Sequence, residues 1–191
     1  MSIFDGFEEQ DGVIINNNWV CWYHTGIPVN PDWLRSLYRM TFLLLVHCMT
    51  CTGLSGCLFL ERKMPKLPYH EKCHCIKTPI SQSLVKTYII ANCAIEKFTN
   101  YVFSDKSNGK KELFESWGYN YYNSNELKVD YEKQAITQYL NGNYILKNVD
   151  MNGQRIAIPI TLNGKTFYSG WIVEPGGKLK NTTPFGGWIN E

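Results

Sequence analysis

The chain has 191 residues, 44 % of them hydrophobic and 19 % charged, so it is able to bury a core and need not be disordered. This length admits one ordinary domain or two small ones. The net charge of +2 is too close to neutral to demand a nucleic-acid partner, and it does not exclude one.

Cysteine and histidine are confined to the first half of the chain. None of the seven cysteines or four histidines lies beyond Cys93, so the two halves differ chemically. We therefore predict two domains, residues 1–82 and 83–191. The odd number of cysteines, their mixture with histidine and the lack of a signal-peptide pattern favour metal binding in a reducing compartment over disulfides.

The first predicted helix begins near residue 30. Residues 1–18 are polar and loop-like, and a cluster of aromatic residues follows them. Asn30 before Pro31 is typical of a helix start, with a capping side chain followed by proline at the first helical position. Apolar residues at helical spacing continue this helix to about Val46.

Residues 40–60 carry no permanent charge, and a run of about 20 such residues is long enough to cross a bilayer. The second half of the run is rich in small, turn-forming residues, and His47 lies near its middle. We therefore favour a buried helix that leads into a loop-rich, cysteine-bearing segment over residues 47–82, and we predict no membrane association. A membrane-spanning helix is the alternative.

Two helices are predicted in the middle of the chain, after an apolar stretch, residues 84–103, that fits either a helix or a strand. The first helix, residues 110–117, is followed by a glycine of the kind that ends helices. The second, residues 125–141, has an apolar stripe at helical spacing, and Ser124 or Asn125 is expected to cap it.

Hydrophobic residues alternate with a period of two after the second helix. The Asn-Gly pairs at residues 152–153 and 163–164 fit two-residue hairpin turns, and residues 175–177 make a third turn. The predicted strands cover residues 144–151, 154–162, 165–173 and about 178–189, with a mild excess of basic residues. The predicted fold is α+β: a helical and loop-rich Cys/His segment, followed by two helices and a four-stranded antiparallel sheet.

Two groups of metal-ligand residues lie on either side of a loop. Cys48 and Cys51 are separated by two residues, and His70, Cys73 and Cys75 follow at similarly short intervals. Zinc takes four ligands at tetrahedral corners, and a two-residue gap lets two thiolates from one turn reach the same ion. We predict a structural zinc site of Cys48, Cys51, His70 and Cys73, with Cys75 able to replace His70 or Cys73. Reduced, partly buried cysteines without a metal are the alternative.

A longer motif surrounds these ligands. Cys48-Met-Thr-Cys51 is followed by a glycine, a phenylalanine and the run Leu-Pro-Tyr-His-Glu-Lys-Cys-His-Cys, which ends at Cys75. Residues 47–80 thereby resemble the C-terminal region of phage minor head, or head-morphogenesis, proteins. The resemblance implies a location in the virion and phage head or portal components as partners. We expect the long helical N-terminal part of that family to be either absent from this sequence or reduced to about residues 30–46.

Short motifs also mark the second half of the chain. They are residues 97–103, Gly109-Lys110, residues 113–119 and Trp171-Ile172-Val173. Residues 94–189 are similar in these motifs to an uncharacterised phage and toxin-associated domain, which is grouped with the barnase/EndoU/colicin/RelE-like nucleases. This resemblance implies helices followed by an antiparallel sheet, metal-independent cleavage of RNA, and action in the host cytoplasm.

Metal-independent cleavage of RNA needs groups that transfer protons and cations that stabilise the charge on the phosphorane. Residues 94–191 contain no histidine, the usual acid or base near neutral pH, so we expect Lys and Arg to take its place. Glu174 is a candidate base if it is buried near a cation. Trp171, Trp188 and Tyr144 either stack on bases or fill the core. The predicted catalytic residues are Lys97, Lys110, Arg155, Tyr168 and Thr183.

Two functions are compatible with these observations. The first is a phage-encoded protein that combines a ribonuclease-like toxin domain with a head-protein-like zinc segment. The alternative is a non-enzymatic minor component of the virion, with the zinc segment as a structural clip and the α+β domain as a binding module. Clustering of Lys97, Lys110 and Arg155 in one concave patch favours the first, and their dispersal together with a large exposed apolar face favours the second.

Overall fold

A computed structural model describes residues 7–10, 13–16, 19–24, 54, 56–67 and 75–188. The chain divides into two compact units, which we call unit 1 and unit 2. Unit 1 comprises Met1–Ile89, Asn148–Gln154 and Glu174–Gly177, and unit 2 comprises Ile90–Lys147, Arg155–Val173 and Lys178–Glu191. The predicted domain boundary after residue 82 stays a prediction, and the predicted helix over residues 30–46 lies outside the described residues.

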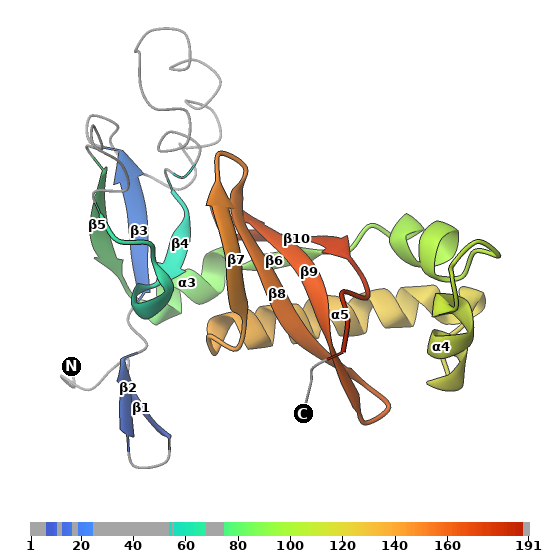
Figure 1. Ribbon diagram of the computed structural model, residues 1–191. Coiled ribbons are helices and arrows are strands. Elements are labelled where there is room, and N and C mark those ends of the chain that lie inside the picture. The colour runs from blue at the N-terminus through green and yellow to red at the C-terminus, as the bar shows by residue number, and fades with distance from the viewer. Residues whose placement is uncertain are drawn as a thin grey trace, which may run out of the picture. The chain divides into compact units, whose positions relative to one another are not determined.

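Unit 1 contains a three-stranded antiparallel sheet. In it, β3 (Trp19–His24) lies between β4 (Leu58–Leu60) and β5 (Cys75–Ile80), and all of β4 is buried (Figure 1). A separate hairpin pairs β1 (Phe7–Gln10) with β2 (Val13–Asn16). Of these strands, β1, β2, β4 and β5 lie in segments that we predicted as loop-like or loop-rich, whereas β3 is formed by the aromatic cluster. The strands β1, β2 and β4 have only three or four residues, too few for a clear alternation of polar and apolar residues.

Short helices and two distant turns complete unit 1. A 3₁₀ helix, η2 (Glu61–Lys63), follows β4, and α3 (Gln82–Tyr88) follows β5. Ser81 caps α3, because its Oγ accepts the backbone N–H of Leu84 at 3.3 Å. The distant turns are joined to β4 and its preceding turn: Gln154 Nε2 donates to the Leu58 carbonyl at 2.8 Å, and the Gly176 N–H donates to the Gly56 carbonyl at 3.1 Å.

Unit 2 is built on a five-stranded mixed sheet with the strand order β6-β10-β9-β8-β7. The α+β fold class is confirmed, but the predicted four-stranded antiparallel sheet is wrong. The additional strand, β6, pairs parallel with β10, with Ile90 opposite Lys178 and Asn92 opposite Lys180. The strands are β6 (Ile90–Asn92), β7 (Ile145–Asp150), β8 (Gly153–Leu162), β9 (Lys165–Glu174) and β10 (Lys178–Thr183).

The turns of this sheet differ in how closely they follow the prediction. Asn163 and Gly164 have φ values of 45° and 74°, the positive angles that a type I′ turn requires. The other predicted Asn-Gly turn shifts by one residue, because β8 already begins at Gly153 and the Asp150 carboxylate accepts the backbone N–H of Asn152 at 2.8 Å. The last strand ends at Thr183 rather than near residue 189.

Four helical elements belong to unit 2: η3 (Lys97–Val102, a π-helix), α4 (Lys110–Ser116), η4 (Tyr121–Asn123) and α5 (Ser124–Leu140). The helices α4 and α5 confirm the two predicted helices. The capping residue differs, because Asn120 caps η4 immediately before α5, with its side chain accepting from the N–H groups of Tyr122 and Asn123. None of the helices in the described part of the chain is long and apolar enough to cross a membrane.

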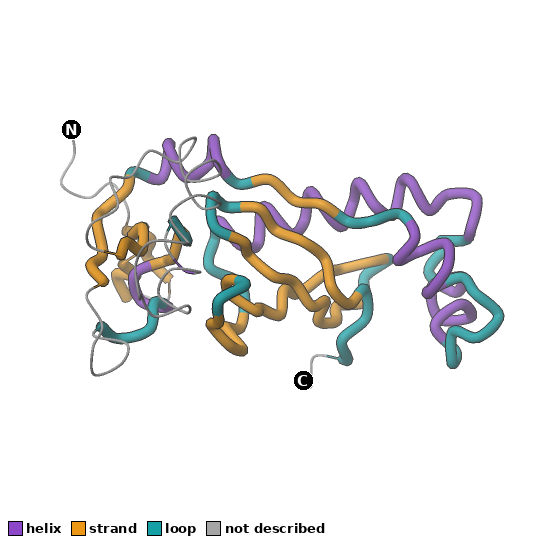
Figure 2. Tube along the Cα trace, turned by 90° about the horizontal axis from the view of Figure 1, so that it is seen from above, coloured by secondary structure: helices purple, strands orange, loops and turns teal. Residues whose placement is uncertain are grey.

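The helix α5 lies along one face of the sheet, as Figures 1 and 2 show from two directions. Its fully buried residues recur at intervals of four, which places them on one side of the helix. Tyr131 is among them, and its hydroxyl donates to the carbonyl of Pro184 at 3.1 Å. The buried residues of α5 with no exposed surface are Leu127, Tyr131, Ala135 and Tyr139.

Candidate nucleic-acid interface

The two faces of the unit 2 sheet differ in burial. Along β9 the odd-numbered residues from Phe167 to Val173 are buried, whereas the even-numbered residues between them are partly exposed. The side chains on the second set point away from α5. We call this side the open face. Its residues are Arg155, Ala157, Pro159 and Thr161 on β8, Thr166, Tyr168, Gly170 and Ile172 on β9, and Lys178, Lys180 and Thr182 on β10.

Two contacts set the register of the open face. The hydroxyls of Thr161 and Thr166 lie 3.0 Å apart across β8 and β9, and a Cβ at Gly170 would lie 3.0 Å from Thr182 Oγ1 across β9 and β10. Counting along the strands from these pairs places Arg155 opposite Ile172 and Ile172 opposite Lys180. Arg155 and Lys180 therefore lie in one row, with their Cα atoms about 10 Å apart.

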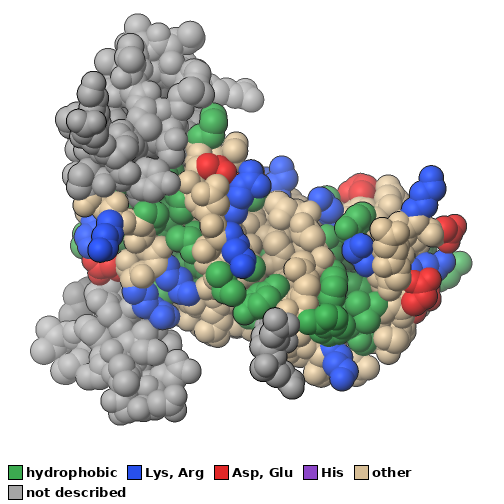
Figure 3. Space-filling model, viewed as in Figure 1, with side chains coloured by type: hydrophobic (Ala, Val, Ile, Leu, Met, Phe, Trp, Pro, Cys, Tyr) green, Lys and Arg blue, Asp and Glu red, His purple; other side chains and the backbone are tan. Residues whose placement is uncertain are grey.

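The open face is cationic. Residues 155–173 and 178–188 contain no Asp or Glu, and the same counting places Glu174, the last residue of β9, opposite Lys178 at one end of the face. Arg155 and Lys180 are exposed and Lys178 is partly exposed, and Figure 3, which looks onto this face, shows Lys and Arg side chains gathered over the sheet. Neither Lys178 nor Lys180 forms an ion pair within the described part of the chain. Their charges are therefore available to an anionic partner.

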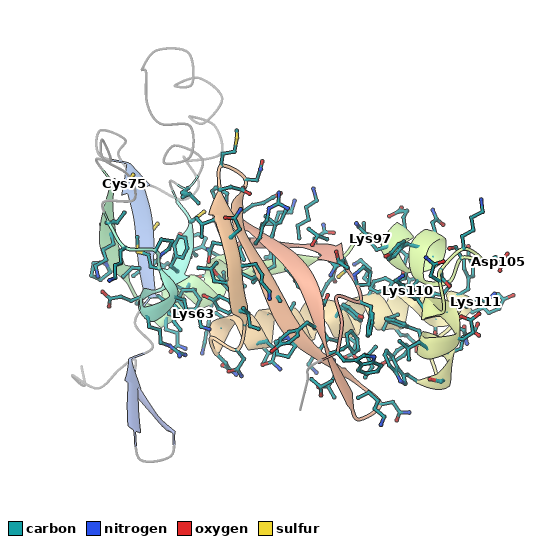
Figure 4. All side chains as sticks on the ribbon, viewed as in Figure 1. Lys63, Cys75, Lys97, Asp105, Lys110 and Lys111 are labelled. Carbon is teal, nitrogen blue, oxygen red and sulfur yellow. The ribbon has the colours of Figure 1, made fainter. Side chains whose placement is uncertain are left out.

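Lys97 closes the edge of the sheet beyond β6. Its Nζ donates to the carbonyl of Thr182 at 2.9 Å. The pairing of β6 with β10 ends at Lys180, so the ammonium group supplies a hydrogen bond that the neighbouring strand does not. Lys97 thus lies at the end of β10, next to the predicted site residue Thr183 (Figure 4).

Tyr168 and Thr183 lie in the same region. The backbone N–H and carbonyl of Tyr168 bond to Gly187 at 2.9 Å and Gly186 at 2.7 Å, and its side chain is on the open face. The Thr183 carbonyl accepts a hydrogen bond from Ser169 Oγ at 3.0 Å. Lys97, Tyr168 and Thr183 are therefore gathered around the end of β10, and Arg155 lies farther along the open face.

Lys110 is not part of this group. Its Nζ donates to the carbonyl of Ser107 at 3.1 Å and lies 4.9 Å from the centre of the Tyr101 ring. These contacts stabilise the loop that precedes α4. Figure 4 shows Lys110 beside α4, away from the end of β10 where Lys97 lies. The structure therefore gathers Lys97, Tyr168 and Thr183 around the end of β10, places Arg155 about 13 Å along the strands from Tyr168, and leaves Lys110 outside this group.

The other residues that the sequence suggested for base stacking or proton transfer differ in how exposed their side chains are. Trp171 and Tyr144 are 1 % and 3 % exposed, so they fill the core and are unable to stack on a base. Trp188 is 50 % exposed but packs against Trp117 and Phe185 beside the buried face. Glu174 is partly exposed at the end of β9. Lys180 and Thr182, which sequence reasoning did not select as catalytic, lie on the open face; the strict alternation along β10 is the signal that pointed there.

Most of the predicted zinc site lies outside the described residues. This applies to Cys48, Cys51, His70 and Cys73, whereas Cys75 is buried at the start of β5, opposite His24 in the register with β3. The described residues contain no group of three His, Cys, Asp or Glu side chains able to hold a metal ion. The zinc site stays a prediction, which rests on thiol and imidazole donors at a spacing typical of zinc sites.

Two other cysteines lie in the core. Cys57 and Cys93 are fully buried, and burial raises the pKa of both thiols well above the ordinary value. Because the thiolate is the nucleophilic form of cysteine, both thiols are poor nucleophiles at neutral pH.

Comparison with protein-family models, with curated proteins and with solved structures gives no match for this chain. The resemblances to head-morphogenesis proteins and to barnase/EndoU/colicin/RelE-like nucleases therefore stay predictions. Any functional assignment rests on the residues of the chain itself.

Proposed function

We propose that unit 2 binds RNA through its open face. The observation that carries the proposal is the cationic surface formed by Arg155, Lys178 and Lys180 on strands whose residues 155–173 and 178–188 contain no carboxylate side chain. Lys and Arg side chains that neutralise phosphates release condensed counterions, and this release supplies much of the affinity of proteins for nucleic acids.

The shape and the apolar groups of the open face suit a single strand. Tyr168 and Ile172 lie on either side of Gly170 on the open face of β9 and offer an aromatic ring and an apolar side chain to unpaired bases. Bonds from Gly186 and Gly187 hold the backbone of Tyr168 in place. A duplex keeps its bases stacked inside the helix, so we propose single-stranded RNA as the ligand.

The resemblance to ribonucleases extends the proposal to cleavage of the bound RNA. We assign charge stabilisation to Arg155, proton transfer to Tyr168 and a polar contact to Thr183. The Tyr168 hydroxyl has no hydrogen-bond partner among the described residues, so it is available to substrate. Lys97 and Lys110 already donate to backbone carbonyls, and we assign them structural roles instead. This scheme uses no metal ion.

The test uses the full chain, because the turns at residues 148–154 and 174–177 belong to unit 1. Tightly induced expression in a bacterium is followed by gel analysis of total RNA and sequencing of cleavage ends. Discrete cuts that disappear with Tyr168→Phe are the expected result. In parallel, the purified protein is titrated with labelled single-stranded RNA.

Each result of these two assays has a distinct meaning. Binding without cleavage would retain RNA binding and remove the ribonuclease. Folded protein that neither binds nor cuts RNA would overturn both and favour the non-enzymatic virion component.

For the first half of the chain we propose a structural zinc site within a head-protein-like segment. The support is the donor set itself, Cys48, Cys51, His70 and Cys73, with Cys75 as the alternative ligand. When bound, zinc would hold together a segment with few apolar anchors. The same resemblance leads us to propose a phage origin, with head or portal components as partners of this segment.

Chelation of zinc is expected to destabilise residues 30–80 while unit 2 stays folded, because all proposed ligands precede Ile76 and belong to unit 1. Hydrogen exchange with and without chelator measures this separation. Cys48→Ser should lower the melting temperature, whereas His74→Ala, which changes a neighbouring residue outside the ligand set, should not. Absence of zinc from protein made without added metal, together with unchanged melting of Cys48→Ser, would show that the zinc prediction is wrong.

A further inference from the structure

Two threonine hydroxyls lie over Gly170 on the open face. A Cβ at this position would stand 3.0 Å from Thr182 Oγ1, 3.3 Å from Thr183 Cβ and 3.5 Å from Thr183 Oγ1. The Cβ atom of any other residue type at position 170 would be in close contact with both threonine side chains. Glycine at this strand position therefore allows the two hydroxyls to lie close together above β9.

The backbone under these hydroxyls is held by three side chains. Lys97 Nζ bonds the Thr182 carbonyl at 2.9 Å, and Ser169 Oγ bonds the Thr183 carbonyl at 3.0 Å. Asn181 Nδ2 bonds the Gly170 carbonyl at 3.3 Å. Both threonine side chains are only partly exposed, and the backbone that carries them is held in place before any ligand arrives.

The open face carries a second pair of threonine hydroxyls, which provides a comparison. Thr161 and Thr166 bond to each other at 3.0 Å. In contrast, the hydroxyls of Thr182 and Thr183 have no hydrogen-bond partner in the described part of the chain, and Lys180 lies at the preceding open-face position of β10. Two available O–H donors on the same strand as the Lys180 ammonium group match the acceptor-only oxygens of a phosphate.

We propose that Thr182, Thr183 and Lys180 form a phosphate-binding subsite over Gly170. Its ligand is a backbone phosphate of the RNA strand, so the subsite rests on the proposed function of the open face and specifies where one phosphate is held. Free inorganic phosphates have the same chemistry, and the experiment separates the two sources. The hydroxyls donate to the phosphate oxygens, and Lys180 compensates their charge.

The test compares three variants of the full chain: Thr182→Val/Thr183→Val, Gly170→Ala, and the control Thr87→Val/Thr137→Val, which removes two exposed threonine hydroxyls from α3 and α5, outside the open face. Valine keeps the shape and strand preference of threonine and removes only the hydroxyl. Binding of a short fluorescent oligouridylate is measured by anisotropy, and tripolyphosphate is used as a competitor without bases. Melting temperatures establish that each variant is folded.

The Thr182→Val/Thr183→Val variant is expected to bind the oligouridylate about tenfold more weakly, and tripolyphosphate should compete less well by a similar factor. Gly170→Ala should show part of this loss, and the control should stay within about twofold of the wild type. Equal affinities for the wild type and the Thr182/Thr183 variant would overturn the subsite while RNA binding stands. Wild-type protein that binds tripolyphosphate but not RNA would overturn the RNA ligand and the proposed function together.

Discussion

Replacing Arg155, Lys178 and Lys180 together by alanine is expected to weaken the binding of single-stranded RNA by about 100-fold at low salt. These residues supply the positive charge of the open face, and Glu174 at the end of β9 offsets only part of it. For single strands the slope of log K against log salt changes by about 0.7 for each phosphate contact, so the variant should lose about 2 from this slope. Anisotropy titrations at several salt concentrations measure both quantities.

The matched control is Lys86→Ala/Lys106→Ala/Lys133→Ala. It removes the same formal charge from exposed positions on α3, on the loop before α4 and on α5. If the affinity depends on the location of the charge, this control should change the salt slope by less than about 1. Equal losses for the two triple variants would mean that net charge alone attracts RNA and that the open face is not the binding surface.

The helices and hairpins of unit 2 were predictable because their signals are local. The apolar stripe of α5 and the Asn163-Gly164 turn can each be recognised from residues that lie close together in the sequence. The strand β6 is different, because it has three residues and pairs with β10 from far along the chain. Three residues are too few to show a periodic pattern. The strands β6 and β10 are also far apart in the sequence and pair in parallel, so no tight turn joins them and marks the pairing.

The site was less predictable than the fold, because hydrogen bonding decides what each side chain is able to do. Lys97 and Lys110 stand in motifs that suggested catalysis, but each ammonium group donates to a backbone carbonyl. The alternation of side chains along β9 places Tyr168 and Trp171 on opposite faces of the sheet. The sequence alone does not show which of the two faces α5 covers. That coverage makes Trp171 a core residue and leaves Tyr168 on the open face.

The largest loss of stability in unit 2 is expected from Phe167→Ala. The Phe167 ring is fully buried, and removal of a buried phenylalanine costs about 3–5 kcal/mol of unfolding free energy. This loss is a large part of the stability of an ordinary domain, about 5–15 kcal/mol. Urea unfolding followed by tryptophan fluorescence measures it. The aromatic rings around Phe167 are those of Phe114, Trp117, Tyr131, Phe185 and Trp188.

Tyr122→Ala is the matched control, because it removes an aromatic ring that is 93 % exposed and should cost only about 0.5 kcal/mol. Similar losses for the two variants would contradict the packing around Phe167. Phe167 and Tyr168 are neighbours on β9 that face opposite sides of the sheet. At low temperature, the folded fraction of Phe167→Ala should therefore bind RNA with the affinity of the wild type. A loss of intrinsic affinity in that fraction would mean that the buried face sets the geometry of the open face and that the two are not independent.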